Sequence, residues 1–200
     1  MAHARRSTTP LAAPIDLSRL SPSTLVRLPL GPLDTADTFA QRLEGCRDLG
    51  SVYELVKEAA TLTTGRSRGG LMLALADLGN HPQGWFGAFY PVASNIIVMN
   101  EVPMERVRQT DPALWPLYAF HVLLHEYVHA LGVTDEAQCR IEVRHICARL
   151  FRPDHLIHAM TEDMQRFFPK IVFPHQAWKP RALDLRLVRD FDRSGTTYIR

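Results

Sequence analysis

The stretch from residue 121 to residue 136 constrains the fold more than any other part of the chain. Residues 117–124 are apolar except for His121, and they run directly into His125-Glu126-Tyr127-Val128-His129. Apolar side chains at this density predict a helix that is buried on most of its sides. The first and last residues of the five-residue pattern are one turn apart, so both imidazoles project from the same face. A domain must therefore enclose this helix and still leave one polar face of it accessible.

The same five residues predict a chemistry. Two imidazoles one turn apart are a common ligand pair for zinc, which lowers the pKa of a bound water to about 7. Glu126 lies about 100° around the helix from His125, so it can reach that water without binding the metal. A carboxylate in this position accepts a proton as the water attacks a carbonyl. The pattern predicts metal-assisted hydrolysis, most often of a peptide bond, with His125 and His129 as Zn²⁺ ligands and Glu126 as general base.

The residues after the pattern supply candidates for a third ligand. Gly132 follows His129 by three positions, where a glycine can end a helix in the left-handed conformation. The resulting turn would bring Asp135 back to the metal. Asp135 is equally well placed to cap the next helix, and the two roles are compatible because a carboxylate has two oxygens. The alternative third ligands are Glu136, Glu142, His145 and water.

The full pattern over residues 125–135 reads His-Glu-x-x-His-x-x-Gly-x-x-Asp. It resembles the zinc-binding motif of the metzincin metallopeptidases, and its Asp-ending form is similar to the snapalysin-type branch. The resemblance implies that zinc is held by the two histidines and Asp135, with Glu126 as general base and general acid. It also implies a methionine-containing turn beneath the metal, for which Met160 and Met164 are candidates.

A second resemblance is to the small metallopeptidases called minigluzincins. Their third ligand is a glutamate on the helix that follows the motif, which here implies Glu136 or Glu142. In peptidases of both kinds, a strand shortly before the active-site helix forms a sheet edge that binds the substrate by strand addition. The resemblance extends that role to residues 85–90 or 95–100, and the alternative is that both are ordinary core strands.

Hydrophobic periodicity and turn signals predict an α+β fold. We expect a small mixed twisted sheet packed on the active-site helix, with additional helices before and after it. A Ser-x-x-Glu capping pattern at Ser51 marks the start of the second helix. The predicted helices are 35–48, 51–65, 111–131, 136–151 and 153–168, and the predicted strands are 71–78, 85–90 and 95–100. Alternating leucines at 183–187 indicate a strand or an arm.

Domain organisation follows from the distribution of proline and polar residues. Residues 1–33 read as a flexible N-terminal arm, 34–168 as a zincin-like domain, and 169–200 as an extended C-terminal arm. Our hypothesis is that one of the two arms covers the cleft and inhibits the protein. We expect a peptide or protein substrate. The alternative function is a regulatory or non-catalytic zinc-binding module with a peptidase-like fold that acts through a protein partner.

Composition excludes several other classes. The net charge of +2 gives no reason to expect a nucleic-acid partner. No apolar stretch approaches the roughly 20 residues of a membrane span, and no apolar run follows Arg5 and Arg6, so neither a membrane segment nor a signal peptide is predicted. Three cysteines with no disulfide spacing favour buried thiols in a reducing compartment, which predicts a cytoplasmic protein.

One group remains unassigned by the motif. Peptide hydrolysis requires a donor that stabilises the negative charge on the substrate's carbonyl oxygen. The candidates in the sequence are Tyr90, Tyr127 and His121. His121 is one turn before His125 on the same helix face, and it is alternatively a half-buried histidine with a purely structural role.

Overall fold

The computed structural model describes residues 34–79, 86–164, 168 and 183–189. The described residues all belong to one compact unit, which spans residues 33–200. The expected N-terminal arm and most of the expected C-terminal arm lie outside the described residues. Cleft coverage by either arm therefore stays a prediction.

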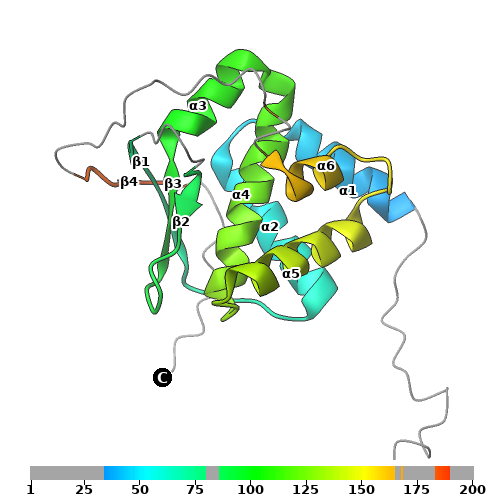
Figure 1. Ribbon diagram of the computed structural model, residues 1–200, viewed down its shortest axis with the longest axis horizontal. Coiled ribbons are helices and arrows are strands. Elements are labelled where there is room, and N and C mark those ends of the chain that lie inside the picture. The colour runs from blue at the N-terminus through cyan, green and yellow to red at the C-terminus, as the bar shows by residue number, and fades with distance from the viewer. Residues whose placement is uncertain (1–33, 80–85, 165–167, 169–182, 190–200) are drawn as a thin grey trace, which may run out of the picture. The chain divides into compact units, whose positions relative to one another are not determined.

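The described residues form an α+β fold, as the sequence predicts. The elements in chain order are α1 (Asp34–Gly45), α2 (Leu49–Thr64), β1 (Met72–Ala76), β2 (Ala88–Phe89), β3 (Ile96–Asn100), α3 (Glu101–Thr110), the 3₁₀ turn η3 (Pro112–Leu114), α4 (Trp115–Ala130), α5 (Glu136–Leu150), α6 (Ile157–Glu162) and β4 (Arg186–Leu187). Figure 1 shows α4 standing between the sheet and the helices α1, α2 and α5.

The sheet is small and mixed, with strand order β2-β3-β1-β4. β1 and β3 are parallel, whereas β2 pairs antiparallel with β3 and β4 pairs antiparallel with β1. Among the described strands, β2 therefore lies at an edge of the sheet and β3 in its interior. Of the two strands considered for substrate addition, only β2 has the position that this role requires, and the role itself stays a prediction. β4 falls in the expected C-terminal arm and shows that part of this region joins the domain.

The helix that carries the two histidines and Glu126 is the centre of the fold. α4 contacts every other described helix and the strands β2 and β3. Its apolar side chains are buried almost without exception, and Tyr118, Phe120, Leu123 and Leu124 are fully enclosed. Burial of such side chains contributes about 1.5–3 kcal/mol each relative to exposure. The predicted buried helix is confirmed, and it is surrounded on all but one face.

Local capping explains where α4 and α2 begin. The Asp111 carboxylate accepts a hydrogen bond from the Ala113 N–H and opens η3, and α4 proper starts at Trp115. The Ser51 capping prediction was wrong. Asp48 is the N-cap of α2 and accepts bonds from both the N–H and the hydroxyl of Ser51, which lies inside the helix. Gly65 ends α2 at φ +69°, as expected.

Two further helices differ from the prediction. α3 was missed because Asn100, which looked like the end of a strand, also caps a helix by accepting the Val102 N–H. Asn100 is buried, and its amide also donates to the carbonyl oxygens of Gly79 and Phe86. In the predicted helix at 153–168, the residues before Ile157 form turns and a bend, α6 ends at Glu162, and residues 165–167 lie outside the described residues. Among the described residues, no helix combines the length and the apolarity needed to cross a membrane.

Candidate metal centre

The structure brings His125 and His129 together on the open face of α4. Their Nε2 atoms are 3.1 Å apart, and both side chains are largely buried. The chain then turns at Gly132, whose φ of +100° lies in the left-handed region. This confirms the helix-ending role predicted for the glycine. The turn leads into α5, which packs along α4.

Glu136, the first residue of α5, lies beside both histidines. One carboxylate oxygen is 3.2 Å from Nε2 of His129 and the other is 3.4 Å from Nε2 of His125. Arg140, one turn further along α5, approaches the same carboxylate at 3.7 Å. The carboxylate that completes the group is thus that of Glu136, which the sequence offered only as an alternative.

Asp135 and Glu142 lie elsewhere. Asp135 is the N-cap of α5, where its Oδ1 accepts the Gln138 N–H at 2.8 Å. The Glu142 side chain pairs with Arg66 at 3.1 Å. His145, a further candidate, is exposed on α5. The structure therefore gives Asp135 the capping role that the sequence also allowed, and its metal-binding role stays a prediction.

A backbone contact fixes the orientation of His129. Its Nδ1 is 2.6 Å from the carbonyl oxygen of Val133. A carbonyl only accepts hydrogen bonds, so Nδ1 carries the proton and Nε2 of the neutral ring presents a lone pair. Metal-binding histidines commonly have this arrangement, in which a carbonyl sets the tautomer of the ligand. The turn at Gly132 is what places Val133 there.

Cys139 is a neighbour of the histidines that sequence reasoning read only as a buried thiol. Its Sγ and the ring nitrogens of His125 and His129 lie within 4.8 Å of one another. The thiol donates to the His125 backbone carbonyl at 3.4 Å, and burial raises the pKa of the thiol to about 12. The signal for this position was its place one turn after Glu136, on the face of α5 that meets α4.

Glu126 is the acidic residue that faces the cleft next to the histidines. Burial raises the pKa of this carboxyl to about 7, although the nearby His129 and a hydrogen bond from the Tyr90 backbone oppose the shift. A carboxyl with a pKa near neutrality is suited to accept and return a proton at physiological pH. The Tyr90 contact also joins the base to the end of the edge strand.

Two cavities meet at Glu126 and Glu136. One has a volume of about 520 Å³ and is also bordered by His121, and the other has a volume of about 280 Å³ and is also bordered by His129. Residues around β2 line both cavities. Both cavities therefore lie beside β2, which is an edge strand among the described strands, and an extended ligand would need such an edge.

The two methionines considered for a turn beneath the metal both border the larger cavity. Met160 is fully buried in α6, and Met164 is half-buried just after it. They pack at the side of the cleft that is nearest to α6. Their contribution to a metal site stays a prediction.

A separate network lies at the C-terminal end of α4, and we call it the Arg68 clamp. The Arg68 guanidinium donates to the Tyr90 hydroxyl, the Ala130 carbonyl and the Ser94 carbonyl at 2.6–2.7 Å. The Arg68 backbone N–H donates to the Tyr127 hydroxyl at 3.0 Å. The clamp fastens the β2–β3 connection to α4 and engages both tyrosines that the sequence offered as oxyanion donors.

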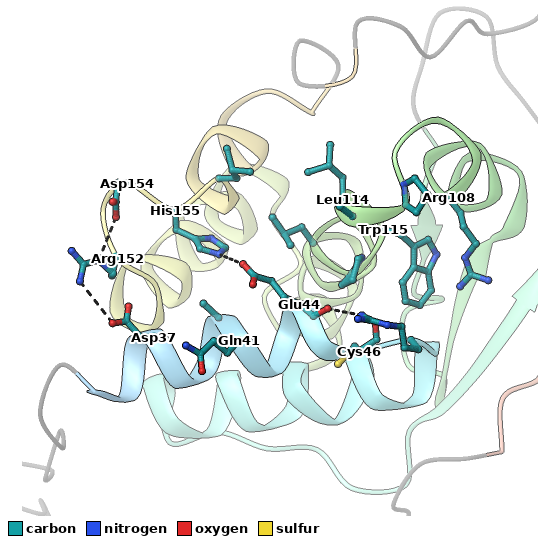
Figure 2. A pocket seen from close by; sticks show the side chains of 17 residues that line it. Asp37, Gln41, Glu44, Cys46, Arg108, Leu114, Trp115, Arg152, Asp154 and His155 are labelled. Carbon is teal, nitrogen blue, oxygen red and sulfur yellow. Dashed lines mark hydrogen bonds and ion pairs between the residues drawn. The ribbon is translucent and has the colours of Figure 1, made fainter.

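A larger cavity lies away from the histidines, between α1, η3 and the loop before α6. Its volume is about 920 Å³. Several of its charged groups are paired with one another, as Figure 2 shows: His155 with Glu44, and Arg152 with Asp37 and Asp154. Arg47 donates to the backbone carbonyls of Glu44 and Cys46, and Arg108 lies over the Trp115 ring.

No family model, no curated protein and no solved structure matches this chain. The motif and the geometry of the site are therefore what support a functional conclusion.

Proposed function

We propose that the protein is a zinc-dependent metallopeptidase whose metal is held by His125, His129 and Glu136. One observation carries the proposal: two imidazole nitrogens and a carboxylate converge within 3.1–3.4 Å of one another beside Glu126. The three ligating residues come from two helices that pack together, so the group is held by the fold rather than by a loop alone.

The chemistry of these donors fits zinc. The hydrogen bond to Val133 places a proton on Nδ1 of His129, so in the neutral ring Nε2 presents a lone pair beside the Glu136 carboxylate. Burial lowers the pKa of His125, which favours the neutral form of that ring. Neutral imidazoles and one carboxylate form the ligand set of catalytic zinc sites that retain an open position. A divalent cation bound between the two Nε2 atoms and the Glu136 carboxylate would be attracted to all three groups.

The chain's own residues supply the remaining functions. Zinc, when bound, acidifies water and polarises a carbonyl. Glu126 then accepts the proton and returns it to the leaving amine, for which its pKa of about 7 is well matched. The β2 edge offers backbone groups that position an extended peptide across the two cavities. The expected substrate is therefore a peptide bond in an extended segment.

A second candidate function is a structural zinc site that serves a binding partner. Cys139 favours it, because two histidines, a thiolate and a carboxylate would close the coordination shell. Against it, the Cys139 thiol is directed to the His125 carbonyl, and a closed site gives no reason for a buried Glu126 beside it.

The test compares wild type with Glu126→Gln. We expect about one zinc per chain in both proteins, and cleavage of a quenched fluorescent peptide library by wild type only, with a loss of roughly 10²–10⁴-fold in the variant. Equal zinc with no cleavage by wild type would favour the structural site. Absence of zinc from a zinc-supplied wild type would refute both functions.

A further inference from the structure

We infer that His121 is the hydrogen-bond donor to the scissile carbonyl oxygen, the catalytic group that the motif leaves unassigned. The inference rests on the proposed function and deepens it. It rests on the position of His121 in the cleft and on its ring, whose buried Nδ1 has no partner among the described residues. It also rests on the hydrogen bonds that hold Tyr90 and Tyr127, the other two candidates, in the Arg68 clamp.

His121 stands in line with the metal ligands. It precedes His125 by four residues on α4, so the two rings project from the same face. It borders the 520 Å³ cavity together with Glu126 and with Gly87 and Ala88 at the start of the edge strand. A peptide that lies along β2 over Glu126 would pass this ring.

The two nitrogens of His121 have different surroundings. Nδ1 is enclosed and makes no hydrogen bond to the described residues. The side chain as a whole is only half-buried, and Nε2 is not among its enclosed, unpartnered atoms, so Nε2 is the nitrogen open to the cavity. A buried N–H without an acceptor is rarer in proteins than a bare acceptor. The favoured tautomer therefore carries its proton on Nε2, toward the cleft.

The ring is neutral under ordinary conditions. Burial, helped by the nearby His125, lowers the pKa of His121 to about 4. A neutral donor does not repel a divalent cation nearby, and it can still donate to an oxygen that gains negative charge during the reaction.

The two tyrosines are already engaged. The Tyr127 side chain is fully buried, and its hydroxyl accepts from the Arg68 backbone. The Tyr90 hydroxyl accepts from the Arg68 guanidinium and donates to the Ser94 carbonyl at 3.0 Å. The Tyr90 proton is therefore used within the Arg68 clamp, and the fully buried Tyr127 borders neither of the two cavities at Glu126.

The test uses three variants of the zinc-loaded protein. His121→Leu removes the donor, His121→Gln keeps an N–H near the position of Nε2, and His145→Leu alters an exposed histidine of α5 outside the cleft. We expect His121→Leu to lower kcat by about 10²–10³-fold, the usual effect of losing one such donor, with KM changed by less than about threefold. His121→Gln should recover at least tenfold of this loss, and His145→Leu should match wild type. Zinc content should be equal in all four proteins.

A second readout does not depend on turnover. Long-range ¹H–¹⁵N spectra of the metal-free protein at pH 7 should show His121 neutral with its proton on Nε2. A phosphinic peptide, which places an anionic oxygen where the carbonyl oxygen would be, should bind the zinc-loaded His121→Leu protein about 10²-fold more weakly than wild type.

Three outcomes overturn the inference. An active His121→Leu protein within twofold of wild type refutes it and leaves the proposed function intact, as does a ring protonated on Nδ1. A zinc-loaded wild type that cleaves no peptide and binds no phosphinic peptide refutes the proposed function and this inference together.

Discussion

The candidate metal centre and the Arg68 clamp both lie at the C-terminal half of α4, but their polar groups are arranged differently. In the clamp, one guanidinium meets three oxygens at 2.6–2.7 Å, so donors and acceptors are matched. In the candidate metal centre, two imidazoles and the Glu136 carboxylate crowd together at 3.1–3.4 Å, and the buried Glu126 carboxyl beside them has a raised pKa.

The difference is between a network that is complete in itself and a cluster of ligand-type groups. Matched hydrogen bonds stabilise a fold, whereas two imidazoles and a carboxylate at this spacing are what the proposed metal would bind. The clamp holds the Tyr90 side chain, and the Tyr90 backbone donates a hydrogen bond to Glu126. The Arg68 clamp therefore supports the position of Glu126 in the candidate site. Four experiments test this difference between the two regions.

The largest effect should come from removing the carboxylate of the metal centre. Glu136→Gln should weaken zinc binding by at least about 100-fold. Loss of a residue that merely hydrogen-bonds a metal ligand costs up to about 100-fold, and loss of a ligand should cost no less. Asp135→Asn is the matched control, because asparagine is an equally good helix N-cap, and it should leave zinc affinity nearly unchanged. Competition with a chelating dye measures both.

The same titration discriminates among the ligand sets. If Asp135→Asn weakened zinc binding and Glu136→Gln did not, the third ligand would be Asp135. A comparable loss in Cys139→Ala would add the thiol to the ligands and favour the structural site.

Breaking the clamp should mainly affect stability. Arg68→Ala removes charge-assisted hydrogen bonds to two carbonyls and a hydroxyl, so we expect the free energy of unfolding to fall by about 3 kcal/mol. Arg66→Ala, two residues away, removes only the exposed pair with Glu142 and should cost less than about 1 kcal/mol. Urea unfolding of the metal-free proteins tests this. Equal effects of the two substitutions would show that the clamp is not a special source of stability.

The Glu126 carboxyl should make the metal-free protein less stable as pH rises. Its folded pKa of about 7 exceeds the ordinary value of 4.5, so between these pH values the folded state binds more protons than the unfolded state, and stability falls with increasing pH. Glu126→Gln should therefore be more stable than wild type by about 3 kcal/mol at pH 8, and nearly equal to it at pH 4.5. Thermal and urea unfolding across this range measure the difference. A constant difference at all pH values would show that the pKa is not raised.

The smallest effect should come from the turn that joins the two helices of the metal centre. Gly132→Ala forces a side chain to adopt φ +100° and should cost about 1 kcal/mol of stability. Zinc affinity should also fall, because the same turn holds Val133 against His129. Gly45→Ala at the end of α1 has open space and no left-handed backbone, so it should be neutral or slightly stabilising.

Much of the fold could be predicted from local sequence. The apolar run before His125 determined a buried helix, and the glycines at 65 and 132 marked left-handed turns. The β1 and β3 strands followed from short apolar runs between turn signals. These features depend on neighbours within a few residues, which is why periodicity reveals them.

The helix α3 and the start of α2 were harder to predict because more than one nearby residue could serve as the helix N-cap. Asn100 ends a strand and caps a helix at once, and Asp48 outcompetes Ser51 as the cap of α2. Asn, Asp and Ser are all acceptable helix N-caps in isolation. Packing of the neighbouring elements selects which of these residues begins the helix.

For the candidate site, the sequence by itself determined that two imidazoles and Glu126 share one helix, since their spacing fixes their directions. Only the tertiary structure decided which residues meet them. The angle at which α5 leaves the Gly132 turn places Glu136 at the histidines and gives Asp135 to the helix cap. The Arg68 clamp joins residues up to 62 positions apart. Such contacts depend on how whole elements pack, and no local pattern in the chain encodes them.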